Sequence, residues 1–219
     1  MNTRPRIKIC CISSWNEAQL AIQYGASALG LVGNMPSGPG VIPDEQILTL
    51  TQATPPGVSS FLLTSETEAR GIEAHYRKTL PSTIQIVDSV PFSTYKTLRE
   101  RIPGVKLVQV IHVIGESSLD ESLKIAPEVD ALLLDSGNPY AAVKELGGTG
   151  RTHNWNISRQ IVEQVGVPVF LAGGLKAENV QAAVEAVQPY GLDLCSGVRS
   201  QGHLDEAKLA SFMEQVMSL

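Results

Sequence analysis

The chain has 219 residues, of which 43 % are hydrophobic, so it can bury the core of one α/β barrel and leaves little room for a second domain. Its net charge of −5, without a basic stripe, argues against nucleic acids and anionic membranes as partners. The three cysteines, Cys10, Cys11 and Cys195, match no zinc pattern and argue against a disulfide framework, so we expect no metal and a cytoplasmic location. The apolar stretch Ile7–Ile12 is too short for a signal peptide or a membrane span.

Short apolar runs alternate with longer amphipathic stretches along the chain. The predicted strands are Ile7–Ile12, Ala28–Val32, Val58–Leu63, Thr83–Val87, Lys106–Ile111, Ala131–Leu134, Pro168–Leu171 and Leu192–Cys195. The first predicted helix has Ser13 or Ser14 as its N-cap and ends at Tyr24, and a later one is capped by Ser65. The other predicted helices are Pro43–Ala53, Phe92–Arg101, Leu119–Ala126, Ile157–Gln164, Ala177–Ala186 and Asp205–Met217.

This rhythm predicts the fold. Strands rich in Val, Ile and Leu, with little polar alternation, are typical of a parallel sheet covered by helices. About eight strand–helix units with right-handed crossovers close into a (β/α)8 TIM barrel, which we expect to form a single domain over residues 1–219. An open, doubly wound sheet is the alternative, although it would not need eight regular units.

Glycines follow the last two predicted strands, where TIM barrels commonly bind phosphate. Glycine lets backbone N–H groups approach an anion without a Cβ in the way, and a short helix starting after Gly197 would direct its N-terminus at the phosphate. Gly173, Gly174, Ser196 and Gly197 are predicted to bind phosphate, and a third glycine-rich loop follows the sixth strand. The full set predicted to bind phosphate or substrate adds Gly148, Thr149 and Gly150 of that loop and Asp193. The alternative is that these glycines serve only as turn residues.

Two strand ends carry candidate acid–base groups. Asp135 follows four apolar residues, and burial there would raise its pKa and suit it to act as an acid. A helix cap or a buried ion pair is the alternative for this carboxylate. Cys10 and Cys11 end the first predicted strand, where the period of two predicts that only one of them faces the barrel interior. His112 ends the fifth strand, and we expect it near the barrel mouth.

Several segments in order resemble phosphoribosylanthranilate isomerases. The family begins K-I-C-G-I-T and continues with G-A-D-A-L-G-F, L-L-L-D-[ST], G-G-T-G-K-T-F-D-W, L-A-G-G-L-x-x-x-N-V and V-D-V-S-S-G-V. The corresponding segments here are Lys8–Cys10, Tyr24–Gly30, Leu132–Ser136, Gly147–Trp155, Leu171–Val180 and Leu192–Val198. The resemblance implies a (β/α)8 barrel in tryptophan biosynthesis that performs an Amadori rearrangement of a phosphorylated sugar-amine without a cofactor. It also implies that Cys10 is the general base and Asp135 the general acid.

The chain departs from the family pattern mainly at the aminobenzoate end of the expected site. The arginine of the family's S-P-R has no counterpart in Pro36–Val41, and the family's Q-L-H-G is replaced by Gln85–Asp88. Cys11 stands where the family has glycine, and Asn154 where it has aspartate. Two alternatives therefore stay open, a related isomerase acting on another phosphoribosyl amine and a non-catalytic phosphate-binding protein. The sequence leaves monomer and homodimer equally open.

Overall fold

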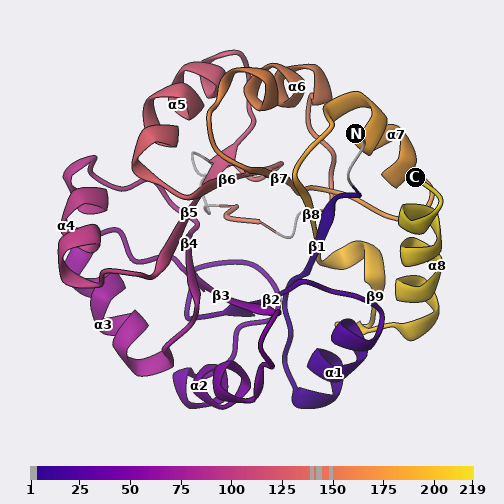
Figure 1. Cartoon of the computed structure of the whole chain (residues 1–219), viewed down its shortest axis with the longest axis horizontal. Coiled ribbons are helices and arrows are strands. Elements are labelled where there is room, and N and C mark those ends of the chain that lie inside the picture. The colour runs from indigo at the N-terminus through magenta and orange to yellow at the C-terminus, as the bar shows by residue number, and fades with distance from the viewer. Residues whose placement is uncertain (1–3, 139–140, 142–144, 148–149) are drawn as a thin grey trace.

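Eight parallel strands close into a barrel in the computed structural model, which describes residues 4–138, 141, 145–147 and 150–219 (Figure 1). The strands are β1 (Arg6–Ile9), β2 (Ala28–Val32), β3 (Ser59–Thr64), β4 (Thr83–Ile86), β5 (Lys106–His112), β6 (Ala131–Asp135), β7 (Val169–Leu171) and β8 (Gly191–Leu194). β1 pairs in parallel with both β2 and β8. This closure confirms the predicted TIM barrel and rules out the open sheet.

Helices form a ring outside the barrel, each between two consecutive strands except the last (Figure 1). They are α1 (Trp15–Gln23), α2 (Asp44–Ala53), α3 (Ala69–Thr79), α4 (Ser93–Arg101), α5 (Ser117–Ile125), α6 (Trp155–Gln164), α7 (Val180–Val187) and α8 (Glu206–Met217). Within the described part of the chain, no helix combines the length and the apolar character needed to cross a lipid bilayer.

Two predicted helix caps have different outcomes. Ser14 is the N-cap of α1, because its hydroxyl accepts a hydrogen bond from the Glu17 amide at 3.2 Å. The prediction that Ser65 caps α3 is wrong. That helix begins after Glu68, while the Ser65 hydroxyl donates to the backbone oxygen of Asn34 in the loop after β2.

The strand alternation decides which side chains face the barrel interior. In β6, Leu132 and Leu134 pack outward against the helices, while Ala131 and Leu133 belong to the cluster inside the barrel. Asp135 has the same parity as the inward pair, so its carboxyl group points inward at the carboxyl end of the strand. An otherwise apolar strand thus places one carboxylic acid, Asp135, where barrel enzymes hold their catalytic groups.

Candidate active site

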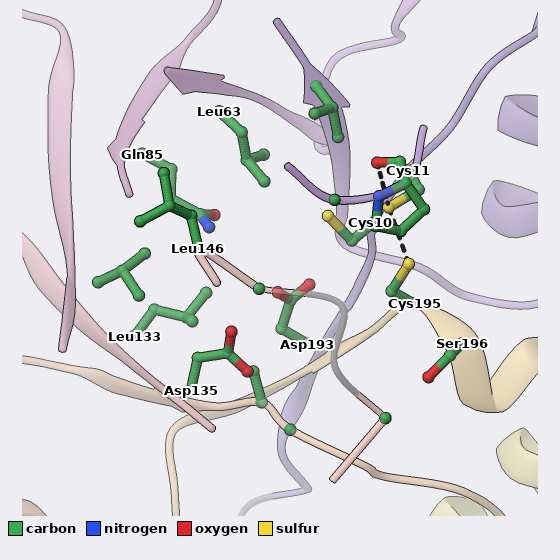
Figure 2. A pocket seen from close by; sticks show the side chains of 18 of the residues that line it. Cys10, Cys11, Leu63, Gln85, Leu133, Asp135, Leu146, Asp193, Cys195 and Ser196 are labelled. Carbon is green, nitrogen blue, oxygen red and sulfur yellow. Dashed lines mark hydrogen bonds between the residues drawn. The ribbon is translucent and has the colours of Figure 1, made fainter. Parts of the chain in front are cut away.

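A cavity opens at the carboxyl ends of the strands, and it brings together the predicted site residues that the structure describes (Figure 2). These are Cys10, Asp135, Gly150, Gly173, Gly174, Asp193, Ser196 and Gly197. Gly148 and Thr149, also predicted for the site, lie outside the described residues. Residues from five separate parts of the chain therefore line one cavity, as the order of strands in a closed barrel requires.

Backbone contacts explain the glycines at the end of the cavity formed by the loops after β7 and β8. A Cβ at Gly174 would lie 2.7 Å from the carbonyl carbon of Arg151, and Gly174 itself has a φ of +61°. A Cβ at Gly197 would overlap the carbonyl oxygen of Leu175. Glycine is therefore required at both positions, because a side chain there would collide with the backbone of the facing loop.

The helix expected after Gly197 is not present. The chain forms a three-residue 3-10 turn, Ser196–Val198, and then a short hairpin of β9 (Arg199–Ser200) and β10 (His203–Leu204). The next α-helix, α8, starts only after Asp205, whose side chain accepts from the Lys208 amide and caps that helix. The prediction failed because the cap lies farther along the chain than the glycine.

Asp135 is buried, and its surroundings favour the protonated acid. Burial raises the pKa of this carboxyl group, and the backbone N–H of Ser136 and the nearby His112 only partly oppose that shift. Its side chain points into the cavity beside Asp193 in Figure 2. A carboxyl group that keeps its proton closer to neutral pH is suited to donate it to a bound ligand.

Both Cys10 and Cys11 line the cavity, so the prediction that only one of them faces inward is wrong. β1 ends at Ile9, and Cys11 adopts a left-handed conformation with a φ of +63°, which turns its side chain back toward the interior. The guanidinium group of Arg199 donates to the backbone oxygens of Cys10 at 3.1 Å and Cys11 at 2.5 Å. These bonds help to hold a conformation that residues with a Cβ rarely adopt.

The thiol of Cys10 lies in surroundings that favour its ionised form. Interaction with the Cys11 side chain lowers the pKa of Cys10, and the buried cation of Lys8 lowers it further, against the opposing effect of burial. The pKa of Cys11 is raised, by the neighbouring Cys10 and Cys195 side chains and then by burial. Cys10 is therefore the better candidate for a thiolate base.

Lys8 supplies a positive charge from beneath the cavity. Its side chain is fully buried, and its Nζ atom lies 2.7 Å from Oδ1 of Asp193, which lines the cavity from the neighbouring strand. Burial alone would lower the pKa of Lys8, but Asp193 outweighs it and holds the lysine in its charged form. The Lys8 cation and the Cys10 thiol are neighbours, because a Cβ added at Gly30 would lie within 3.0 Å of both Lys8 Nζ and Cys10 Sγ.

The opposite end of the cavity is neutral. The loop after β2 contributes Met35, Ser37, Gly38 and Pro39 to its lining, and the described lining residues include no lysine or arginine. Arg151 is exposed outside this lining and forms an ion pair with Glu145. His112 ends β5 opposite Asp135, at the mouth end of the barrel as expected, but it is not among the residues that line the cavity, because its ring is turned to the backbone oxygen of Val87 at 3.0 Å.

The residues predicted for the site did not include Gln85 and Cys195, which also line the cavity. Gln85 is 3 % exposed, and its Oε1 atom has no hydrogen-bond partner among the described residues. An unsatisfied buried oxygen in a cavity wall is ready to accept a donor from a ligand. The strand period could have found it, because Gln85 lies between the outward-facing Ile84 and Ile86 of β4.

Comparisons with known proteins agree with this geometry. The chain matches the family described as "N-(5'phosphoribosyl)anthranilate (PRA) isomerase" over residues 7–215. It is 34 % identical over 212 residues to the N-(5'-phosphoribosyl)anthranilate isomerase of Methanocella arvoryzae, covering 96 % of this chain and 97 % of the relative. It is 36 % identical over 236 residues to that of Methanosarcina acetivorans, covering 99 % and 97 %. The crystal structure of the Thermotoga maritima enzyme has the same fold, with a TM-score of 0.84 at 24 % identity over 98 % of this chain and 100 % of the other. The chain therefore belongs to the N-(5'-phosphoribosyl)anthranilate isomerase family.

Proposed function

We propose that this protein is a phosphoribosylanthranilate isomerase of tryptophan biosynthesis. It would convert N-(5'-phosphoribosyl)anthranilate into the corresponding 1-deoxyribulose 5-phosphate by a cofactor-independent Amadori rearrangement. The observation that carries the proposal is the shared cavity of Cys10 and Asp135, one a thiol with a lowered pKa and the other a carboxyl group with a raised pKa. With pKa values shifted in these directions, the thiol can act as the general base and the carboxyl group as the general acid.

The reaction needs one proton donated and one removed. Asp135 gives its proton to the furanose ring oxygen, the C1–O bond breaks, and the sugar opens to an iminium ion at C1. The Cys10 thiolate then takes the proton from C2, and the electron pair of that C–H bond neutralises the iminium nitrogen to give an enolamine. The enolamine tautomerises to the ketose, and a final proton exchange restores Asp135 and Cys10.

The glycine-rich end of the cavity would hold the substrate phosphate. Gly173, Gly174, Ser196 and Gly197 provide backbone N–H groups at the ends of β7 and β8, where TIM barrels commonly bind phosphate. Binding through neutral backbone dipoles is compatible with the negative net charge of the chain. Asp193, held by Lys8, would face the sugar between the phosphate and the reacting carbons.

A second candidate is the same rearrangement on a phosphoribosyl amine without a carboxylate. It is favoured by the neutral mouth, where Met35, Ser37, Gly38 and Pro39 offer no cation to an aminobenzoate. A charge-assisted pair with a carboxylate contributes roughly 1.5–3 kcal/mol, so its absence weakens binding of the aminobenzoate by about ten- to a hundredfold. A protein that only binds the phosphate would have no use for the perturbed pKa values of Cys10 and Asp135.

The test is turnover of two matched substrates by the purified protein. Phosphoribosylanthranilate is followed by the loss of its fluorescence, and phosphoribosylaniline, which lacks only the carboxylate, is followed by product separation. Turnover of phosphoribosylanthranilate that disappears in Cys10→Ala supports the first proposal. A higher kcat/KM for phosphoribosylaniline identifies the second candidate as the better description. Absence of turnover with both, in protein that still binds inorganic phosphate, would refute both.

A further inference from the structure

Cys195 stands next to Cys11 at the edge of the active-site cavity, and the mechanism above uses neither thiol as an acid or a base. We propose that Cys11 and Cys195 form an oxidisable pair, which a hydroperoxide converts into a disulfide in the wall of the active site. The two sulfur atoms are 2.8 Å apart (Figure 2). A disulfide bond is about 2.05 Å long, so the sulfurs need to approach by only roughly 0.8 Å.

The barrel topology explains how residues 184 positions apart come together. β1 and β8 are neighbours, with Ile9 opposite Leu194, and the Cys10 amide donates to the Leu194 oxygen at 2.7 Å. Cys195 directly follows β8, while the left-handed turn at Cys11 directs its side chain back across that strand end. The two thiols are therefore positioned by paired backbone rather than by mobile side chains, which lowers the entropy lost when they bond.

The oxidation balances with one hydroperoxide per pair. Cys195 is the more accessible thiol, being only partly buried, whereas Cys11 is buried. The sulfur of Cys195 attacks the peroxide, forms a sulfenic acid and releases one water from hydrogen peroxide. The sulfur of Cys11 then attacks the sulfenic sulfur, the S–O bond breaks, and a second water leaves with the Cys11 proton. Two thiols are oxidised by two electrons, and a dithiol reductant reverses the step.

The same contacts connect the pair to catalysis. Interaction with the Cys11 side chain is the largest cause of the lowered pKa of Cys10, and a disulfide has no S–H group to donate. In the oxidised protein the pKa of Cys10 should therefore rise, because its largest lowering cause is lost and the Lys8 cation and the Cys11 backbone N–H alone remain to oppose burial. This consequence rests on the proposed role of Cys10 as the base, whereas formation of the disulfide does not.

The test treats the whole protein with one equivalent of hydrogen peroxide and measures its intact mass, then digests it with trypsin without reduction. We expect a loss of about 2 Da and a cross-link between peptides Ile9–Arg70 and Ala177–Arg199. Cys10 and Cys11 lie in the same tryptic peptide, so the cross-link alone does not show which of them is bonded to Cys195. Three variants make that assignment. Cys11→Gly and Cys195→Ser carry the residues of the quoted family motifs, and glycine suits the left-handed turn, so both should fold and fail to cross-link. Cys10→Ser should cross-link like the wild type.

Activity is measured separately, as the dependence of kcat/KM on pH before and after oxidation. We expect the acidic limb to move to higher pH in the oxidised wild type, to return with dithiothreitol, and not to respond to peroxide in Cys195→Ser. A cross-link that persists in Cys11→Gly, or sulfinic acid without any cross-link, would overturn the proposed pair. A cross-link with no activity even in the reduced protein would leave the pair standing and contradict the proposed function instead.

Discussion

Replacing Pro39 by arginine should improve the use of phosphoribosylanthranilate. Pro39 is exposed and lines the neutral end of the cavity, in the loop where the chain lacks the arginine of the family's S-P-R. Its φ is not in the left-handed region, in contrast to Gly38 and Gly40 on either side, so an ordinary side chain fits that backbone. A guanidinium group there could form a bidentate pair with the substrate carboxylate.

The size of the effect follows from the exposure of the site. A hydrogen-bonded pair with a charged group contributes roughly 1.5–3 kcal/mol, and solvent at an exposed position brings it toward the lower limit. About 1.4 kcal/mol corresponds to a tenfold change, so we expect KM to fall by about tenfold. kcat should stay nearly constant, because the carboxylate is distant from the bonds that change and binds equally in the ground and transition states.

The assay is steady-state kinetics by fluorescence, with Pro39→Ala as the matched control. The alanine variant removes the proline ring without adding a charge, so the comparison isolates the cation from any change in loop stiffness. Phosphoribosylaniline serves as the matched substrate, and its KM should not respond to the arginine. Equal KM values for the arginine and alanine variants, or a wild-type KM already in the low micromolar range, would show that the carboxylate is held elsewhere and refute this reasoning.

Three further predictions concern the catalytic pair, the phosphate end and the buried ion pair. Cys10→Ala and Asp135→Asn should each lower kcat by about a hundredfold or more, as loss of an acid–base group does, and a loss below about threefold would remove that residue from the mechanism. kcat/KM should fall on the acidic side as the Cys10 thiolate gains a proton and on the alkaline side as Asp135 loses one, so any residual activity of Asp135→Asn should lack the alkaline fall. Gly197→Ala should raise the inhibition constant of inorganic phosphate about tenfold or more, because the added Cβ meets a backbone oxygen and must displace a loop; an unchanged constant would move the phosphate elsewhere. Asp193→Asn leaves the buried charge of Lys8 without its partner and should lower the free energy of unfolding by about 3–5 kcal/mol in urea titrations, whereas a loss below about 1 kcal/mol would show that the cation finds another partner.

The fold and part of the cavity could be predicted from the sequence, because they depend on local and periodic features. The apolar runs located the strands, and the run Ala131–Leu134 placed Asp135 at the end of one of them. The glycines after β7 and β8 were found by their type and their place at strand ends. Each of these inferences needs only local sequence and the known geometry of a parallel barrel.

The rest depends on contacts between distant segments. Nothing in the local pattern shows that Cys11 leaves the strand conformation, since its left-handed turn is held by Arg199, a residue 188 positions away in the chain. The neighbouring Cys195 was likewise hidden, because the pairing of β1 with β8 exists only after the barrel closes. The absent helix after Gly197 has a similar cause, since the hairpin there is anchored by the ion pair of Arg199 with Glu17 at 3.0 Å.

The positions where this chain departs from the family pattern lie at the end of the cavity where a substitution disturbs the packing least. At the phosphate end, Gly174 and Gly197 touch the backbone of facing loops, so a side chain at either position disturbs the packing as well as the ligand site. At the neutral end, Pro39 is exposed in a surface loop, where substitutions change the free energy of unfolding little. Selection on the amine can therefore act on the mouth without disturbing the proposed phosphate site or the pair of Cys10 and Asp135. A barrel built in this way can change the amine it accepts while it keeps its sugar phosphate and its acid–base chemistry.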